Sequence, residues 1–314
     1  MDAWAIRIHN GHLATSPHVD IVIFLVNEGR ITVRYVALTI SVTKADGTRQ
    51  LFDREKVIRT CLRIGASREV AETIAENIER NIHDGIKTRR ILQMIFKQLS
   101  ERNPAVDQLI DLRTALSLMQ PKPDFERFIQ ILLSEHGYTV VPNQIVRGKC
   151  VEHEIDAVAR KDGKTYIVEV KHHVDHHTLT GLDTSRIARA VFEDITEGFE
   201  LGLNTLEIDK AMIVSNTKFS EHAQRYAECR GIRHIGWSSP RDHNLRTMIT
   251  EKKLYPITYI KGLDTKMMEK LSYKGMILLK QLTTKNPEEL SRETGIPTAA
   301  LNSIAERAKR VETL

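Results

Sequence analysis

Two short segments between residues 151 and 173 carry four side chains whose types and spacing suit hydrolytic chemistry. Both segments alternate apolar and polar residues, as β-strands with one buried face do. Glu154 and Asp156 share one face of the first segment, and Glu169 and Lys171 share one face of the second. The Asp162-Gly163 pair between the segments predicts a tight β-hairpin, which would bring the two faces together.

Such a cluster has a specific chemical use. The carboxylates of Asp156 and Glu169 are the hard oxygen ligands that Mg²⁺ or Mn²⁺ prefers. The ammonium of Lys171 can orient an attacking water or offset negative charge on phosphorus. The alternative is a solvated outer face, the usual place for charged residues on an antiparallel hairpin. The D-x(n)-E-x-K spacing favours the metal site.

This pattern resembles the catalytic core of the PD-(D/E)xK nucleases, especially the Mrr-like restriction endonucleases, with archaeal Holliday-junction resolvases as a more distant similarity. The order of expected elements agrees: a helix over 125–136, three strands, then helix, strand, helix and strand up to residue 237. The resemblance implies a mixed sheet with helices on both faces. It also implies that Glu126, near the start of the helix, and Glu154 assist catalysis. A position on the helix surface is the alternative for Glu126.

Residues 38–119 predict a second functional module. A hairpin around Ala45-Asp46-Gly47 is followed by amphipathic helices over 54–64, 70–81 and 88–100. This order, with the pattern V-T-K-x-D-G-x(4)-F-D-x-x-K, resembles the ATP-cone, the nucleotide-sensing module of ribonucleotide reductases and their repressors. The resemblance implies that ATP or dATP, as an allosteric ligand, is contacted by Val42, Lys44, Lys56, Val57 and Thr88.

One position departs from that family, because Ala45 stands where Arg usually follows the lysine. The phosphate contact of that arginine would then be absent or supplied by another residue. Two lysines near a helix N-terminus would still suit a triphosphate. The chain contains no Walker G-x(4)-G-K-[ST] motif, so the module is expected to sense nucleotide and not to hydrolyse it.

Residues 251–314 are predicted to form an all-α module. They contain 12 Lys and Arg and 8 Asp and Glu, so +4 of the chain's net charge of +5 lies in this segment. Asn286 and Pro287 predict the start of a short helix, and Gly295 its end. The stretches 261–264 and 295–297 resemble the hairpins of tandem helix-hairpin-helix modules, which bind the DNA backbone. Pro297 lacks an N–H, so it removes one donor that the second hairpin would offer to a phosphate. A helical oligomerisation unit is the alternative.

The composition excludes disordered, fibrous and membrane-spanning classes. Hydrophobic residues make up 41% and charged residues 28%, as in ordinary globular proteins. The longest apolar run near the start, 21–26, is far shorter than the roughly 20 residues that cross a bilayer. Cys61, Cys150 and Cys229 match no zinc or redox spacing, which indicates reduced thiols and a cytoplasmic location.

The expected organisation is a leader of unassigned role (1–37), an ATP-cone domain (38–119), a proline-containing linker (120–123), an Mrr-like nuclease domain (124–250) and a DNA-binding module (251–314). The fold class is a multidomain combination of an α+β ATP-cone, a mixed α/β sheet core and an all-α module. The expected function is Mg²⁺-dependent DNA cleavage regulated by ATP or dATP, in restriction or DNA repair, by a homodimer or higher oligomer. A non-catalytic nucleotide-sensing DNA-binding regulator and a structure-specific resolvase are the alternatives.

Overall fold

Residues 6–7, 19–27, 30–38, 40–104, 106 and 109–312 are described by the structure, a computed structural model. The chain divides into two compact units, Met1–Asp107 and Gln108–Leu314. Within the described residues, no helix combines the length and the apolar composition needed to cross a bilayer.

The first unit begins with an antiparallel sheet of β1 (Ile6–Arg7), β2 (Val19–Asn27) and β3 (Arg30–Leu38). The last two strands pair along their whole length, from Val19↔Leu38 to Asn27↔Arg30. These two strands carry none of the residues expected at the sites.

A second small sheet, ordered β5-β4-β6, supports three helices in the same unit. The strands are β4 (Ser41–Thr43), β5 (Arg49–Leu51) and β6 (Ile86–Lys87), and the helices are α1 (Arg54–Arg63), α2 (Arg68–Asn81) and α3 (Thr88–Ser100). Asp53 caps α1 by accepting a hydrogen bond from the Lys56 N–H, as its residue type predicts. The predicted order of two strands and three helices is confirmed, with β6 as an additional short strand.

The second unit is built on a five-stranded mixed sheet ordered β13-β11-β9-β8-β7. Its strands are β7 (Thr139–Arg147), β8 (Glu152–Lys161), β9 (Lys164–Lys171), β11 (Lys210–Ser215) and β13 (Arg233–Ile235). The first three pair antiparallel, whereas β11 lies parallel to both β9 and β13. Asp162 and Gly163 both have positive φ angles, 51° and 70°, as a tight two-residue hairpin turn requires.

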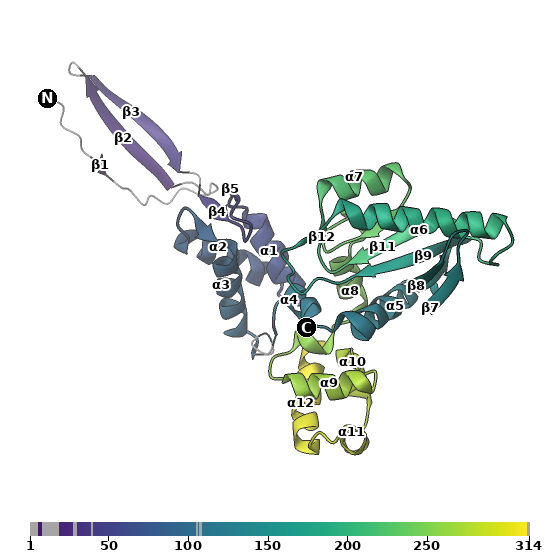
Figure 1. Cartoon of the computed structure of the whole chain (residues 1–314). Helices are drawn as coiled ribbons and strands as arrows, with labels where there is room; N and C mark the ends of the chain where they lie inside the picture. The colour runs from purple at the N-terminus through teal and green to yellow at the C-terminus, as the bar shows by residue number, and fades with distance from the viewer. Residues whose placement is uncertain are drawn as a thin grey trace. The chain divides into compact units, whose positions relative to one another are not determined.

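Helices cover both faces of this sheet (Figure 1). Helices α6 (Leu182–Glu200) and α7 (Glu221–Cys229) lie on one face, and α5 (Glu126–Glu135) and α8 (Leu245–Lys252) on the other. The short strands β10 (Leu179–Thr180) and β12 (Lys218–Phe219) pair parallel beside them. Ile195 of α6 and Ile213 of β11 are fully buried in the core between them, and each such side chain contributes roughly 1.5–3 kcal/mol.

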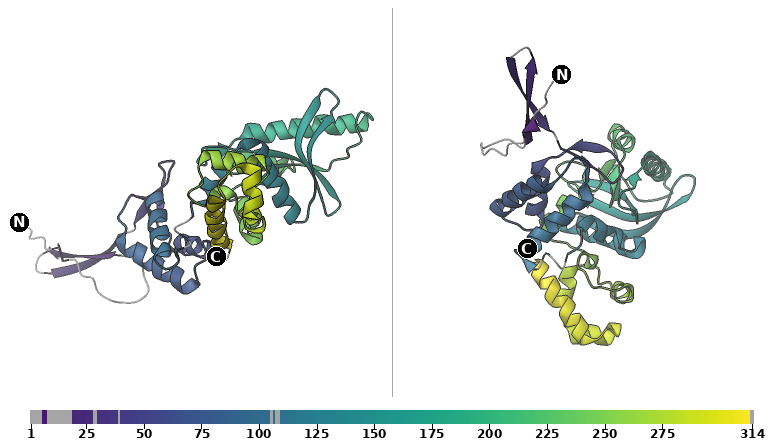
Figure 2. Two further views of the ribbon diagram at one scale, coloured as in Figure 1. Left: turned by 90° about the horizontal axis from the view of Figure 1, so that it is seen from below. Right: turned by 90° about the vertical axis from the view of Figure 1, so that its left-hand side faces the viewer.

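The C-terminal residues form the expected helical group (Figure 2). It consists of the short η3 (Ile257–Tyr259), α9 (Thr265–Tyr273), α10 (Leu279–Thr284), α11 (Pro287–Thr294) and α12 (Thr298–Glu312). Asn286 caps α11, and Gly295 ends it with a left-handed φ of 65°, as predicted.

Helix α4 (Leu112–Ser117) belongs to the second unit, although the sequence pattern assigns these residues to the nucleotide-binding module. The Thr258 hydroxyl donates to the Ala115 carbonyl, and the Ile110 N–H donates to the Tyr259 carbonyl. These bonds join α4 and the residues just before it to η3. The turn η2 (Pro121–Phe125) follows α4. Its Phe125 side chain is completely buried, so the turn packs against the rest of the second unit.

Candidate active site

The site lies where the pairing of β8 with β9 ends and its pairing with β7 is interrupted at one position. The ladder of β8 with β9 runs from Lys161↔Lys164 to Ala157↔Val168, and Asp156 is the next residue of β8. On the other side, Asn143 of β7 faces Asp156 with a left-handed φ of 44°. Gln130 Nε2 of α5 donates to the Asp156 backbone carbonyl at 2.9 Å and to Asn143 Oδ1 at 2.9 Å. A helix side chain therefore replaces the missing strand partner.

The Asp156 carboxylate is held in one orientation. It is buried, with 7% of the residue exposed, and its Oδ2 accepts a hydrogen bond from the Val170 N–H at 2.7 Å. Its other oxygen, Oδ1, lies 3.6 Å from Nζ of Lys122. One oxygen thus replaces a bond of the β8–β9 ladder, and the other faces the site.

Three carboxylates converge on the ammonium of Lys122. Its Nζ lies 3.1 Å from Oε1 of Glu126 and 3.1 Å from Oε1 of Glu154, in addition to the contact with Asp156. Contacts with Glu126 and then Glu154 raise the pKa of Lys122, so the side chain stays protonated. The lysine side chain is 60% exposed, so a cation reaches this point from solvent.

The electrostatics of the site favour positive charge. Burial raises the pKa of Glu126, and the negative charge of Asp156 raises it further, against the opposing effect of Lys122. Burial likewise raises the pKa of Glu169, followed by the charge of Asp156, whereas Lys171 and Lys122 lower it. These acids repel one another, so binding another cation would relieve the repulsion.

The structure brings the five expected nuclease residues to one end of the β8–β9 hairpin. Glu126 is 4% exposed, which excludes a position on the helix surface. The Glu154 side chain is 67% exposed and lies at the rim. Glu169 lies within electrostatic reach of Asp156 and Lys171. Lys171 is exposed at the end of β9.

The donor atoms at this site fit a hard divalent ion. Among the described residues, no group of three or more His, Cys, Asp or Glu side chains is arranged to hold a metal ion. Mg²⁺, however, is commonly bound by only one or two carboxylates, with water completing its coordination. Asp156 and Glu169 are two carboxylates of this site, and Oδ1 of Asp156 faces a cation, the Lys122 ammonium.

The histidines that follow Lys171 contribute to packing. Nε2 of His172 lies 2.9 Å from the Leu116 carbonyl of α4, and its ring packs edge-on against Phe125. Nε2 of His173 lies 3.2 Å from the buried Thr180 hydroxyl. Burial lowers the pKa of both rings, so the neutral form is favoured. These contacts hold the chain just beyond Lys171.

The expected nucleotide residues lie at both ends of β4. Thr43 of β4 pairs in parallel with Lys87 of β6. Lys44 and Thr88, the residues that follow these two strands, therefore lie at the same end of the small sheet. Thr88 is also the first residue of α3. Lys56 lies in the first turn of α1, which follows β5 at the opposite end, where Ser41 pairs with Leu51. The lysine Nζ is 3.8 Å from Asp53. Two further expected residues, Val42 and Val57, are buried in the core.

Two residues of the nuclease site were missed by the sequence patterns. Gln130 lies four residues after Glu126 on α5, and this spacing could have indicated a shared helix face. Lys122 lies between two prolines in a segment that the sequence predicts as a linker. No local pattern indicates that this segment packs beside the hairpin.

The fold and the site define a chain with a restriction-endonuclease-like domain and a nucleotide-binding module. Family models match residues 40–109 as an ATP cone domain, 117–236 as a restriction endonuclease and 255–312 as an AF1548-like C-terminal domain. The expected ATP-cone and Mrr-like domains are thereby confirmed. The helix-hairpin-helix character of the C-terminal module stays a prediction.

Relatives define the family more closely. An uncharacterized protein of Archaeoglobus fulgidus is 36% identical over 181 residues, which are 57% of this chain and 97% of that protein. A second uncharacterized protein of the same organism is 51% identical over 39 residues, or 12% of this chain and 83% of that protein. A crystal structure of a protein of unknown function, AF1548, matches with a TM-score of 0.51 and 32% identity, covering 65% of this chain and 99% of that one. The chain belongs to the AF1548-like family.

Proposed function

We propose that this protein is a DNA endonuclease that hydrolyses phosphodiester bonds with Mg²⁺ or Mn²⁺, and that ATP or dATP at the ATP-cone regulates it. The observation that carries the proposal is the convergence of carboxylates at one end of the β8–β9 hairpin. Glu126, Glu154 and Asp156 meet at one cation, beside the strand that carries Glu169 and Lys171.

Asp156 and Glu169 would hold the divalent ion. When bound, the ion would supply positive charge for the phosphoryl oxygens and lower the pKa of a water. The hydrogen bonds from Val170 and Gln130 keep the Asp156 carboxylate oriented before any ligand arrives. Lys171 would position the attacking water and offset the negative charge that develops on the phosphorus centre. Glu126 and Glu154 assist by strengthening the negative potential of the site.

DNA is the proposed substrate, and the C-terminal helical module is the proposed contact with its backbone. In the first hairpin, Gly262 has a left-handed φ of 82°, and Arg307 Nη1 donates to the Lys261 carbonyl from α12. This bond holds the hairpin in one shape, with α9 beginning three residues after Gly262. Cleavage of both DNA strands would require a dimer, which is part of the proposal.

The regulatory nucleotide is proposed to place its phosphates at the N-terminus of α3. Lys44 and Thr88 lie at that end of the small sheet, and a helix N-terminus combined with a lysine favours anions. Binding without hydrolysis is expected, since a Walker motif is absent from the sequence.

A cleavage assay on full-length protein tests the proposal. Supercoiled, linear and branched DNA are incubated with Mg²⁺, with and without ATP or dATP, using wild type and Asp156→Asn. Cleavage by wild type that is lost in the variant supports the nuclease, and a preference for branched DNA indicates a resolvase. Equal cleavage by wild type and Asp156→Asn overturns the proposed nuclease site.

The second candidate is a non-catalytic, nucleotide-sensing DNA-binding regulator. The Lys122 ammonium favours it, because it already occupies the cation position among three of the carboxylates. Wild-type protein that binds DNA in an ATP-dependent manner, and cleaves none of the DNA forms with Mg²⁺ or Mn²⁺, would establish this alternative.

A further inference from the structure

We propose that Lys122 is a built-in competitor for the divalent ion: its ammonium holds the cation position of the acidic cluster, and the ion binds by displacing it. The inference rests on the proposed function, because it concerns the same carboxylates. It adds a residue that sets how much metal the site requires.

The geometry around Lys122 is that of a bound cation. Its Nζ contacts oxygens from two elements, Glu126 of α5 and Glu154 and Asp156 of β8, at 3.1, 3.1 and 3.6 Å. Val170 occupies only Oδ2 of Asp156, so the oxygen that faces Lys122 is the one left for a metal ion. The ammonium and the ion would therefore face the same oxygen atom, and at such close range their positive charges would repel each other.

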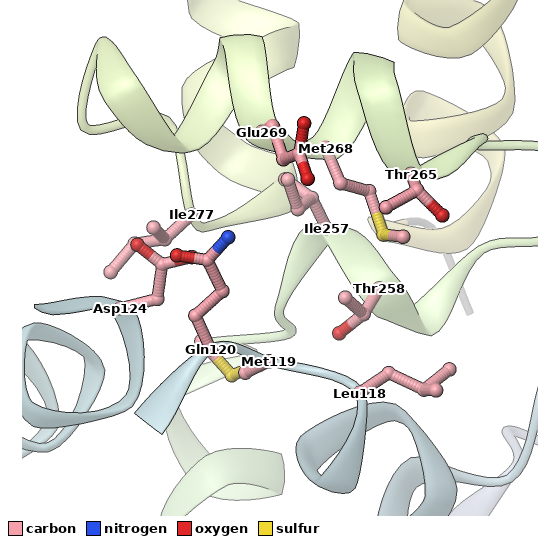
Figure 3. Close-up of a pocket in the computed structure, with 10 residues that line it drawn as sticks. All are labelled: Leu118, Met119, Gln120, Asp124, Ile257, Thr258, Thr265, Met268, Glu269 and Ile277. Carbon is pink, nitrogen blue, oxygen red and sulfur yellow. The ribbon is translucent and has the colours of Figure 1, made fainter. Parts of the chain in front are cut away.

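The backbone that carries Lys122 is anchored on both sides. Lys122 itself has extended angles, φ −126° and ψ 133°, inside the η2 turn. Phe125 donates its N–H to the Gln120 carbonyl, and the buried Asp124 accepts a hydrogen bond from the Ser272 hydroxyl of α9. Gln120 and Asp124 also line a small cavity of about 80 Å³ with residues of the C-terminal module, including Ile257 and Met268 (Figure 3).

This anchoring separates a fixed backbone from a movable side chain. The Lys122 side chain is 60% exposed, and its flexible four-carbon stem can swing into solvent without a backbone change. A tethered ammonium competes effectively because it is always close to the site. A divalent ion has twice the charge of the ammonium and prefers carboxylate oxygens, so it can still displace the ammonium.

The expected effect follows from the occupancy of the site by the ammonium. The apparent dissociation constant of the ion equals its intrinsic value divided by the fraction of protein in which the site is vacant. A lysine that occupies the site nine-tenths of the time therefore weakens ion binding about tenfold. Removing the ammonium should therefore strengthen ion binding by the same factor. Keeping a positive charge at the same place should not.

Mn²⁺ binding to nucleotide-free, full-length protein provides the test. Free Mn²⁺ is measured by its electron paramagnetic resonance signal during titration of wild type, Lys122→Met and Lys122→Arg. Lys149→Met is the matched control, because Lys149 is an exposed lysine whose ion pair, at 2.7 Å, is with Glu197 and not with a carboxylate of the site. We expect Lys122→Met to bind Mn²⁺ about tenfold more tightly, with Lys122→Arg and Lys149→Met unchanged. Equal or weaker binding by Lys122→Met overturns the inference.

Asp156→Asn in the same titration separates the two proposals. If Asp156→Asn abolishes Mn²⁺ binding while Lys122→Met matches wild type, the competitor role fails and the metal site stands. If Asp156→Asn binds Mn²⁺ as wild type does, the metal site itself is wrong, and the competitor role falls with it. Thermal unfolding of each variant, recorded without metal, identifies any protein that has not folded.

Discussion

The Val170 N–H donates a 2.7 Å hydrogen bond to Oδ2 of the Asp156 carboxylate. This bond continues the connection between β8 and β9 beyond the last ladder pair, Ala157↔Val168. The same side chain therefore has a structural and a chemical role. One oxygen closes the sheet, and the other is presented to the acidic cluster.

The two roles of Asp156 can be separated by two substitutions. Asp156→Asn keeps an oxygen that can accept from Val170 but loses the negative charge, so we expect DNA cleavage to fall by about 100-fold or more with little change in melting temperature. Asp156→Ala leaves the Val170 N–H without a partner, which costs about 1–3 kcal/mol of stability. Initial rates of plasmid nicking and thermal unfolding measure the two effects. Equal melting temperatures of the two variants would contradict the structural role.

The acidic cluster predicts a pH dependence of stability. The pKa values of Glu126 and Glu169 are both raised from their ordinary value of 4.5. A carboxyl that binds its proton more tightly in the folded state stabilises the fold below pH 4.5, and this contribution is lost as the pH rises through the raised pKa. In a metal-free buffer, we therefore expect wild type to lose stability from pH 4.5 upward relative to Glu126→Gln and Glu169→Gln.

Melting temperatures across this pH range, with and without Mg²⁺, test the sign. Added Mg²⁺ should reduce the loss in wild type, because the ion offsets the repulsion among the ionised acids. Glu200→Gln, at the exposed end of α6, serves as the control and should follow wild type. A difference between wild type and Glu126→Gln that grows toward low pH would refute the assignment.

The bond between Ser272 and Asp124 predicts that the C-terminal module stabilises the nuclease domain. Asp124 is buried, and the Ser272 hydroxyl donates to its Oδ1. Ser272→Ala removes this donor from a buried carboxylate and should cost about 1–3 kcal/mol. Thr283→Ala is the control, because the Thr283 hydroxyl makes its hydrogen bond within its own helix, to the Lys280 carbonyl, and this bond is exposed to solvent. Urea unfolding compares the two, and equal midpoints would show that the bond contributes little.

The parts of the fold that the sequence predicted depend on local patterns. The Asp162-Gly163 turn and the alternation around it determine the hairpin, and the residues at 286, 287 and 295 determine the ends of α11. Their structural effects reach only a few residues along the chain. The candidate carboxylates were found for the same reason, because β alternation places Glu154 and Asp156 on one face.

The position of Lys122 could not be predicted in this way. Two flanking prolines favour an extended connection when only the sequence is known. In the structure, the segment is held by Asp124 and Ser272, which are 148 residues apart. A contact of that range depends on how the C-terminal module packs, and no local periodicity indicates it. The Asp124 carboxylate accordingly bonds α9 and does not cap the start of α5.

The two lysines expected to bind nucleotide should differ in importance. Lys44 lies beside Thr88 at the N-terminus of α3, whereas Lys56 lies near Asp53 at the other end of β4. Phosphates favour a helix N-terminus with a nearby lysine, and the Asp53 carboxylate partly neutralises Lys56. We therefore expect Lys44→Ala to weaken ATP binding about tenfold, equivalent to roughly 1.4 kcal/mol, and Lys56→Ala to weaken it less.

Calorimetric titration of full-length protein with ATP and dATP measures this order. Lys97→Ala, in the last turn of α3, is the matched control, because it removes a lysine from the opposite end of the same helix. Its affinity should equal that of wild type. If Lys56→Ala has the larger effect, the phosphates bind at the N-terminus of α1, and the nucleotide lies at the Ser41 end of the sheet. Loss of binding in Lys97→Ala as well would indicate general attraction to positive charge in place of a defined phosphate site.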